Sequence, residues 1–188
     1  MRVIAGTYRS RKLKSLKGQA LRPTSDRLRE TLFNIWGDAV NGARFIDIFA
    51  GTGAVGIEAL SRGAAEVVFI EHHAPAAALI RRNLESLDVR SGALVFPVDA
   101  VRGLEKLAAH NKTTHPPFDF VFLDPPYAQA EDYIRVLRFL GSAQFLAAAS
   151  SVVAEHSRKY VLPEQVGNLH RVRVLRQGDA ALTFYRVD

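Results

Sequence analysis

The tetrapeptide Asp124-Pro125-Pro126-Tyr127 follows directly on the stretch 118–123, which is apolar except for Asp119. Two consecutive prolines donate no backbone hydrogen bonds and cannot extend a strand, so the chain is expected to turn here in a rigid corner. Such a corner presents the Asp124 carboxylate and the Pro125 carbonyl as two fixed acceptors, with the Tyr127 ring close to them. The alternative interpretation is an ordinary Pro-Pro turn at a strand end.

Two fixed acceptors suit the exocyclic amino group of a nucleic-acid base. That nitrogen is a poor nucleophile because its lone pair is delocalised into the ring. Acceptors that hold its N–H bonds push it toward tetrahedral geometry and orient it toward an electrophile. Asp124 can also take the proton, and stacking on Tyr127 would contribute about 1–3 kcal/mol. A base in a duplex or in folded RNA must first leave its stack.

A glycine-rich loop, Asp47-Ile48-Phe49-Ala50-Gly51-Thr52-Gly53-Ala54-Val55-Gly56, joins a predicted strand to a predicted helix. Glycines let the backbone turn sharply and approach a ligand without a Cβ clash. The same loop matches the dinucleotide-binding motif G-x-G-x-x-G at Gly51, Gly53 and Gly56. In that interpretation Glu71, twenty residues after Gly51, would be the acid that binds a ribose hydroxyl. The loop alone therefore leaves a nicotinamide-dependent oxidoreductase open.

Two further carboxylates favour a different ligand. Asp47 precedes Gly51 by four residues, where it would sit badly beside a pyrophosphate but would suit a cationic amino-acid head. Asp99 ends the third predicted strand, where it can accept a hydrogen bond from an adenine amino group. With Glu71 these acids lie at strand C-termini, where such folds bind ligands. For each acid the alternative is a capping or salt-bridged carboxylate.

The apolar periodicity predicts the elements that position these residues. A hairpin is expected over 3–13. A helix that begins at Thr24 or Ser25 should bury Leu28, Leu32, Ile35, Trp36 and Ala39. Strands are predicted at 45–49, 67–70, 94–98, 118–123 and 151–155, and helices at 55–61, 74–87, 101–109 and 133–140. Strands at 169–175 and 181–187, joined through Gln177-Gly178-Asp179, form a closing hairpin.

Alternating strands and helices predict an α/β fold with a doubly wound, mostly parallel sheet, and the closing hairpin adds an antiparallel edge. The 188 residues are 48% hydrophobic, enough for one globular domain. We expect a basic N-terminal arm over 1–24 and the main domain over 25–188.

The net charge of +6 is unevenly distributed. Residues 1–29 carry nine Lys or Arg against one acid, whereas residues 30–155 carry ten against fifteen. A basic arm on an acidic globule indicates a polyanionic partner, although a solubilising tail would have the same composition.

The composition also excludes several classes. The chain has no cysteine, which excludes disulfides and zinc–thiolate sites, and its six histidines lack metal-ligand spacing. We therefore predict no metal. Neither a signal peptide nor a membrane-length apolar run is recognisable, so the expectation is a cytoplasmic protein without a membrane partner. We also expect a monomer.

Taken together, these motifs resemble the class I S-adenosylmethionine-dependent methyltransferases, with their Rossmann-like fold, and more narrowly the RsmD family. The resemblance runs along essentially the whole chain. It is carried by Arg2–Gly6, Arg11–Leu13, Arg22–Ile35, Asp47–Gly53, Gly56–Ala64 and Asp124–Tyr127. One departure is Gln177, where the family usually has a tyrosine.

The resemblance implies an enzyme that methylates the N2 amino group of one guanine, expected to be guanine 966, in 16S ribosomal RNA. Its partner would be the small ribosomal subunit or an assembly intermediate, and its cofactor S-adenosylmethionine. Cofactor contacts would come from Arg22, Pro23, Thr24, Asp47, Phe49, Gly51, Gly53, Glu71 and Asp99. Asp124, Pro125, Pro126 and Tyr127 would form the catalytic corner, and Arg9, Arg11, Lys12, Lys14 and Lys17 would bind RNA.

Three alternatives remain open at this point. An adenine-N6 DNA methyltransferase would use the same corner, although 188 residues leave little room for a separate target-reading domain. The nicotinamide-dependent oxidoreductase would use the same glycine loop. An RNA-binding assembly factor would keep the fold without catalysis.

Overall fold

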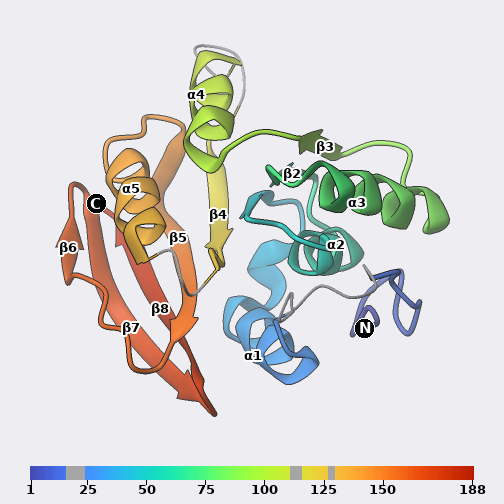
Figure 1. The fold of residues 1–188 in the computed structure, drawn as a ribbon, viewed down its shortest axis with the longest axis horizontal. Coiled ribbons are helices and arrows are strands. Elements are labelled where there is room, and N and C mark those ends of the chain that lie inside the picture. The colour runs from blue at the N-terminus through green and yellow to red at the C-terminus, as the bar shows by residue number, and fades with distance from the viewer. Residues whose placement is uncertain (16–23, 111–115, 127–129) are drawn as a thin grey trace. The chain divides into compact units, whose positions relative to one another are not determined.

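The computed structural model describes residues 1–15, 24–110, 116–126 and 130–188. They fall into two compact units, Met1–Asp99 and Ala100–Asp188, and most of their elements are labelled in Figure 1. Each unit is described by itself. The domain boundary expected at residue 24 adjoins the undescribed stretch 16–23 and stays a prediction.

The first unit alternates helices and strands as the periodicity predicts. Its elements are α1 (Asp26–Trp36), a 3-10 turn η1 (Gly37–Val40), β1 (Arg44–Ile48), α2 (Ala54–Ser61), β2 (Glu66–Ile70), α3 (Ala74–Ser86) and β3 (Ala93–Phe96). β1 pairs with β2 and β2 pairs with β3, both in parallel. All five residues of β1 are buried, as expected for a strand covered on both faces.

Helix α1 begins where the sequence predicts and ends earlier. Ser25 is the N-cap, and its side chain accepts a hydrogen bond from the Leu28 N–H at 3.1 Å. Gly37, with φ of 57°, ends the helix after Trp36. The predicted burial of Ala39 is therefore wrong: the 3-10 turn exposes it and buries Val40 instead.

The N-terminal hairpin forms as a loop with a single antiparallel bridge between Arg2 and Lys12. The Val3 N–H donates to the Arg11 carbonyl at 3.0 Å. Val3 and Leu13 are buried, so the described part of the arm is packed against its own unit.

The second unit holds the remaining elements: α4 (Ala100–His110), β4 (Phe118–Leu123), α5 (Ala130–Leu140), β5 (Leu146–Ser157), β6 (Gln165–Val166), β7 (Leu169–Gln177) and β8 (Ala180–Val187). β4 and β5 are parallel, whereas the β5–β8, β8–β7 and β7–β6 pairs are antiparallel. The predicted change from parallel strands to an antiparallel C-terminal edge is confirmed.

Several boundaries differ from the prediction for local reasons. β3 stops at Phe96 because Pro97 cannot donate to a ladder. β5 extends beyond 151–155 on both sides, because Leu146 pairs with Phe118 of β4, and His156 and Ser157 continue the pairing with β8. The two-residue strand β6 lacks an alternating pattern and was not predicted. None of the helices in the described ranges is long and apolar enough to cross a membrane.

Candidate active site

The loop after β1 is held in an unusual backbone conformation. Phe49, Gly51 and Gly53 all have positive φ, at 60°, 55° and 79°. Left-handed geometry costs a glycine little but strains a residue such as Phe49, and strain of this kind concentrates at ligand sites. Phe49 is partly exposed, and a Cβ on Gly51 would meet nothing closer than 3.9 Å. The loop therefore offers open backbone beside a strained aromatic residue.

All three fingerprint glycines donate their N–H groups to acceptors within the chain. Gly51 donates to the Glu71 carboxylate at 2.8 Å, Gly53 to the Ala50 carbonyl at 2.7 Å, and Gly56 to the Asp47 carboxylate at 2.8 Å. In a dinucleotide site, loop amides at a helix N-terminus would instead face a pyrophosphate. This loop leaves none of its three glycine amides for that purpose.

Gly56 has a packing role that the sequence interpretation did not assign to it. A Cβ at this position would lie 2.3 Å from Cε1 of Phe69 and 2.8 Å from Cγ1 of Val67. Its missing side chain lets α2 lie directly on β2. Gly56 thus makes room for a strand, whereas Gly51 and Gly53 are the glycines expected to face the ligand.

Asp47 lies at the base of the loop and is only 2% exposed. Burial raises the pKa of its carboxyl group to about 8, and the nearby Glu71 charge acts in the same direction. The hydrogen bond from Gly56 opposes both effects. A positively charged ligand group beside this carboxyl would favour its ionised form.

Glu71 follows β2 and is also buried, at 6% exposure. One carboxylate oxygen accepts from Gly51 and the other accepts the His73 N–H at 2.8 Å. Glu71 thus ties the end of β2 to the loop after β1. Asp47, Phe49, Gly51, Gly53 and Glu71 are therefore brought together around one loop.

The remaining predicted cofactor residues are placed less completely. Asp99 directly precedes α4 and is partly exposed. Thr24 is buried next to the Ser25 cap. Arg22 and Pro23 lie outside the described residues.

The di-proline corner is located where the sequence predicts. β4 ends at Leu123, Asp124 is partly exposed, Pro125 is buried and Pro126 is exposed. Tyr127 lies outside the described residues. The corner belongs to the second unit, whereas the glycine loop belongs to the first.

A tyrosine of α5 reaches the corner. The Tyr133 hydroxyl donates to the Glu155 carbonyl at 2.9 Å and lies 3.4 Å from the Pro125 carbonyl. Tyr133 is 2% exposed, and its ring lies against those of His156 and Tyr160. Its hydroxyl ties the carbonyl expected to act as an acceptor to both α5 and β5.

The predicted RNA-binding residues of the arm are exposed where they are described. These are Arg9, Arg11, Lys12 and Lys14, and Lys17 lies outside the described residues. The Arg11 side chain donates to the Ser86 carbonyl at 2.7 Å. The arm thus presents four cations from a docked backbone.

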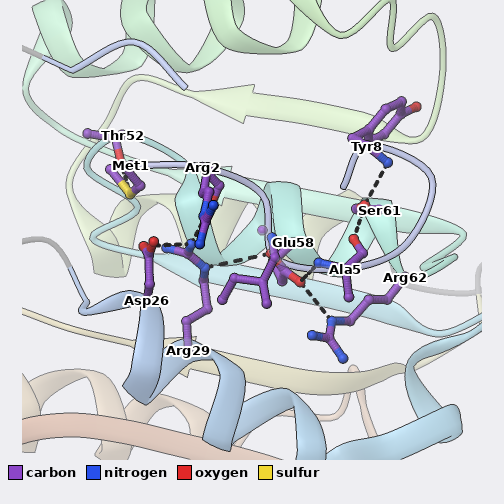
Figure 2. A network of polar contacts seen from close by, with 12 residues as sticks. Met1, Arg2, Ala5, Tyr8, Asp26, Arg29, Thr52, Glu58, Ser61 and Arg62 are labelled. Carbon is purple, nitrogen blue, oxygen red and sulfur yellow. Dashed lines mark hydrogen bonds and ion pairs between the residues drawn. The ribbon is translucent and has the colours of Figure 1, made fainter. Parts of the chain in front are cut away.

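The docking of the arm centres on Glu58 of α2, a fully buried carboxylate (Figure 2). It accepts the N–H groups of Ile4 at 2.8 Å and Ala5 at 3.0 Å. Arg62 donates to it at 2.8 Å, and Nε of Arg29 lies 3.7 Å away. A charge buried this deeply is tolerated because cations and backbone donors surround it.

Arg29 extends the network to the first residues of the arm. Its guanidinium donates to the Arg2 carbonyl at 2.6 Å and to Asp26 at 3.1 Å (Figure 2). Sequence reasoning missed both Arg29 and Glu58. The available signal was a charged residue on the buried face of a predicted helix.

Metal ligands are not grouped in the part of the chain that the structure describes: it contains no cluster of three or more His, Cys, Asp or Glu suited to an ion. His72 is exposed next to Glu71. His156 is buried and hydrogen-bonded to Thr183 at 2.7 Å, so it serves packing within the second unit.

Comparisons with known proteins agree along the full length of the chain. The YlbH protein of Bacillus subtilis (strain 168) is 38% identical over 186 residues, which cover 99% of this chain and 98% of the relative. The Ribosomal RNA small subunit methyltransferase D of Escherichia coli (strain K12) is 36% identical over 181 residues, 94% of this chain and 86% of that protein. The solved structure of the Escherichia coli yhhF protein has a TM-score of 0.80 at 32% identity and covers 100% of this chain and 98% of that one.

This structural likeness confirms the Rossmann-like α/β fold of the class I methyltransferases. The family model described as Conserved hypothetical protein 95 matches residues 1–186. The chain therefore belongs to that family, the RsmD family of ribosomal RNA methyltransferases.

Proposed function

We propose that this protein uses S-adenosylmethionine to methylate the N2 amino group of one guanine in 16S ribosomal RNA, at position 966. The substrate would be the small ribosomal subunit or an assembly intermediate in the cytoplasm. A relative that matches over most of both chains supports it, because it is named a small-subunit ribosomal RNA methyltransferase.

The observation that carries the cofactor assignment is the internal use of the glycine amides. Gly51, Gly53 and Gly56 donate to chain acceptors, and two of these acceptors are the carboxylates of Asp47 and Glu71. A pyrophosphate would meet carboxylates where it needs donors. A ligand with a cationic amino-acid head and ribose hydroxyl donors fits the same surroundings, which disfavours the dinucleotide alternative.

In this proposal each cofactor-binding residue contacts a different part of S-adenosylmethionine. When bound, S-adenosylmethionine supplies an electrophilic methyl group on a sulfonium. Asp47 would face the cofactor's amino group, Glu71 its ribose and Asp99 its adenine, while Arg22, Pro23 and Thr24 would close over it. These residue roles are the ones that the resemblance to the family implies.

The corner after β4 would hold the target base. Asp124 and the Pro125 carbonyl would accept the two N–H bonds of the guanine amino group, and Asp124 would take the proton that the nitrogen loses. Pro126 would stiffen the corner and Tyr127 would stack on the base. The basic arm would contact RNA phosphates through Arg9, Arg11, Lys12, Lys14 and Lys17.

The decisive experiment incubates the protein with labelled S-adenosylmethionine and small subunits that lack the modification. We expect label in a single guanine of 16S RNA. Asp124→Ala should lower turnover on the order of 100-fold, as when one stabilising contact is removed from a preorganised site. Asp179→Asn is a matched control, because it removes a charge from an exposed turn of the same unit.

Other outcomes would select the alternatives. Label in DNA adenine would indicate an adenine-N6 methyltransferase. Calorimetric binding of NADH without binding of S-adenosylhomocysteine would indicate an oxidoreductase. Full biological function in Asp124→Ala would indicate a non-catalytic assembly factor.

A further inference from the structure

Asn83 is a polar residue on the buried face of α3, alongside Leu79 and Ile80, and it is 0% exposed. Its hydrogen bonds explain this burial. Its Nδ2 donates to the Thr52 carbonyl at 3.1 Å and to the Lys14 carbonyl at 3.2 Å. Its Oδ1 accepts the Lys14 N–H at 2.9 Å. Both N–H groups and the oxygen of the amide are therefore used.

The two partners of Asn83 belong to different parts of the proposed reaction. Thr52 stands between the two left-handed glycines of the cofactor loop, Gly51 and Gly53. Lys14 belongs to the basic arm. One side chain thus joins the backbone of the cofactor loop, 31 residues before it, to the backbone of the RNA-binding arm, 69 residues before it.

We propose that Asn83 is a positioning residue that couples cofactor binding to RNA binding. This inference rests on the proposed function. A shift of either Thr52 or Lys14 would break a hydrogen bond and leave a buried polar atom without a partner, which is costly. The conformations of the loop and the arm are therefore linked. Linkage is reciprocal, so a cofactor that holds the loop raises RNA affinity by the same factor as RNA raises cofactor affinity.

A second contact supports the link at the same loop residue. The Thr52 hydroxyl lies 3.9 Å from the sulfur of Met1, the first residue of the arm (Figure 2). The other arm contacts run to helices instead: from Arg2 to α1, from Ile4, Ala5 and Tyr8 to α2, and from Arg11 to Ser86 of α3. Ser61, for example, accepts the Tyr8 N–H at 2.9 Å. Contacts to the loop and contacts to α2 can therefore be tested separately.

The test measures the affinity for unmodified small subunits with and without saturating S-adenosylhomocysteine. We expect the wild type to bind RNA at least about 5-fold more tightly with this cofactor product, within the usual range of coupling. In Asn83→Ala this ratio should fall toward 1. In the control Ser61→Ala, which loosens the arm from α2 only, affinity should fall in both conditions while the ratio is kept. A purely structural role of Asn83 would lower both affinities and leave the ratio unchanged.

Two further measurements test the coupling even if Asn83→Ala folds poorly. Asn83→Asp retains the volume and the acceptor for Lys14 but loses both amide donors, so the ratio should again fall. In the wild type, S-adenosylhomocysteine should slow hydrogen exchange at the Lys14 amide.

Three results would overturn the coupling: a wild-type ratio of 1, an unchanged ratio in both Asn83 variants, or an equal loss of the ratio in Ser61→Ala. A wild type that binds the cofactor and the subunit independently contradicts the coupling alone. A wild type that binds neither contradicts the proposed function as well.

Discussion

The carboxylate of Glu71, at the end of β2, accepts the backbone N–H of Gly51, in the loop after β1, at 2.8 Å. The same carboxylate accepts the His73 N–H through its other oxygen. Glu71 therefore shapes the cofactor loop from a neighbouring strand. A residue expected to bind ribose also determines where the first glycine of the fingerprint lies.

Glu71→Gln should reduce both stability and cofactor affinity. An amide can accept only one of the two N–H groups and turns its own NH2 toward the other, leaving a buried donor unsatisfied at about 1–3 kcal/mol. Urea unfolding and calorimetry with S-adenosylhomocysteine would measure the two losses. Glu85→Gln, on the exposed side of α3, is the control. An affinity equal to that of the control would contradict a ligand role for Glu71.

Asp47→Asn should change how stability depends on pH. The folded-state pKa of Asp47 is raised to about 8 from 3.8, so between these values the folded state holds a proton that the unfolded chain releases. The free energy of unfolding should therefore fall as pH rises from about 4 to 8. Each pKa unit corresponds to about 1.4 kcal/mol, so we expect a fall of more than about 2 kcal/mol.

The Asn variant lacks this proton and should lose that part of the pH dependence, becoming relatively more stable at high pH. It should bind S-adenosylhomocysteine less tightly, because it offers no charge to the cofactor's amino group. Denaturant titrations at several pH values measure the first effect. Parallel stability curves for the two proteins would rule out the raised pKa.

Gly56→Ala and Gly51→Ala should have opposite signatures. The first places a Cβ 2.3 Å from the Phe69 ring and should destabilise the fold by about 1–3 kcal/mol or more through overpacking. In Gly51→Ala the new Cβ has open space around it, and the left-handed backbone should cost about 1 kcal/mol of stability. Gly51→Ala should nevertheless weaken cofactor binding more than Gly56→Ala does. Thermal unfolding and calorimetry separate the two effects. Equal effects of both variants on cofactor affinity would contradict this division of roles.

Glu58→Gln should release the arm and destabilise the first unit. It leaves Arg29, whose side chain has no exposed surface, without its buried counter-charge, a change that typically costs about 3–5 kcal/mol. Hydrogen exchange at the Ile4 and Ala5 amides should accelerate. Glu66→Gln is the control, because its pair with Arg44 is partly exposed and should matter much less. Unchanged protection of the two amides would contradict the docking role of Glu58.

Lys12→Ala should weaken binding to the small subunit and flatten its salt dependence. Each lost phosphate contact lowers the slope of log affinity against log salt by about 0.7–0.9. Arg90→Ala removes the same charge from an exposed ion pair with Asp88, outside the arm, and should leave the slope unchanged. Identical slopes for Lys12→Ala and the wild type would count against the arm as the RNA contact.

Local chemistry was enough to predict most of the elements and both motifs. The prolines after β4 end that strand because they lack N–H groups, and Ser25 caps α1 because its side chain accepts a nearby N–H. Each of these effects acts within a few residues, so the order of residue types reveals it. The β1–α2 glycine loop and the closing hairpin were predictable for the same reason.

Contacts between distant segments could not be predicted in this way. Gly56 was recognised only as part of the glycine fingerprint, yet it makes room for Phe69, and Asn83 looked like an ordinary helix residue until Lys14 and Thr52 were placed beside it. A buried polar group is stable only with a suitable partner, and folding brings that partner from far along the chain. Periodicity shows which face of a helix is buried, but the packing of the whole unit selects the atoms that face it.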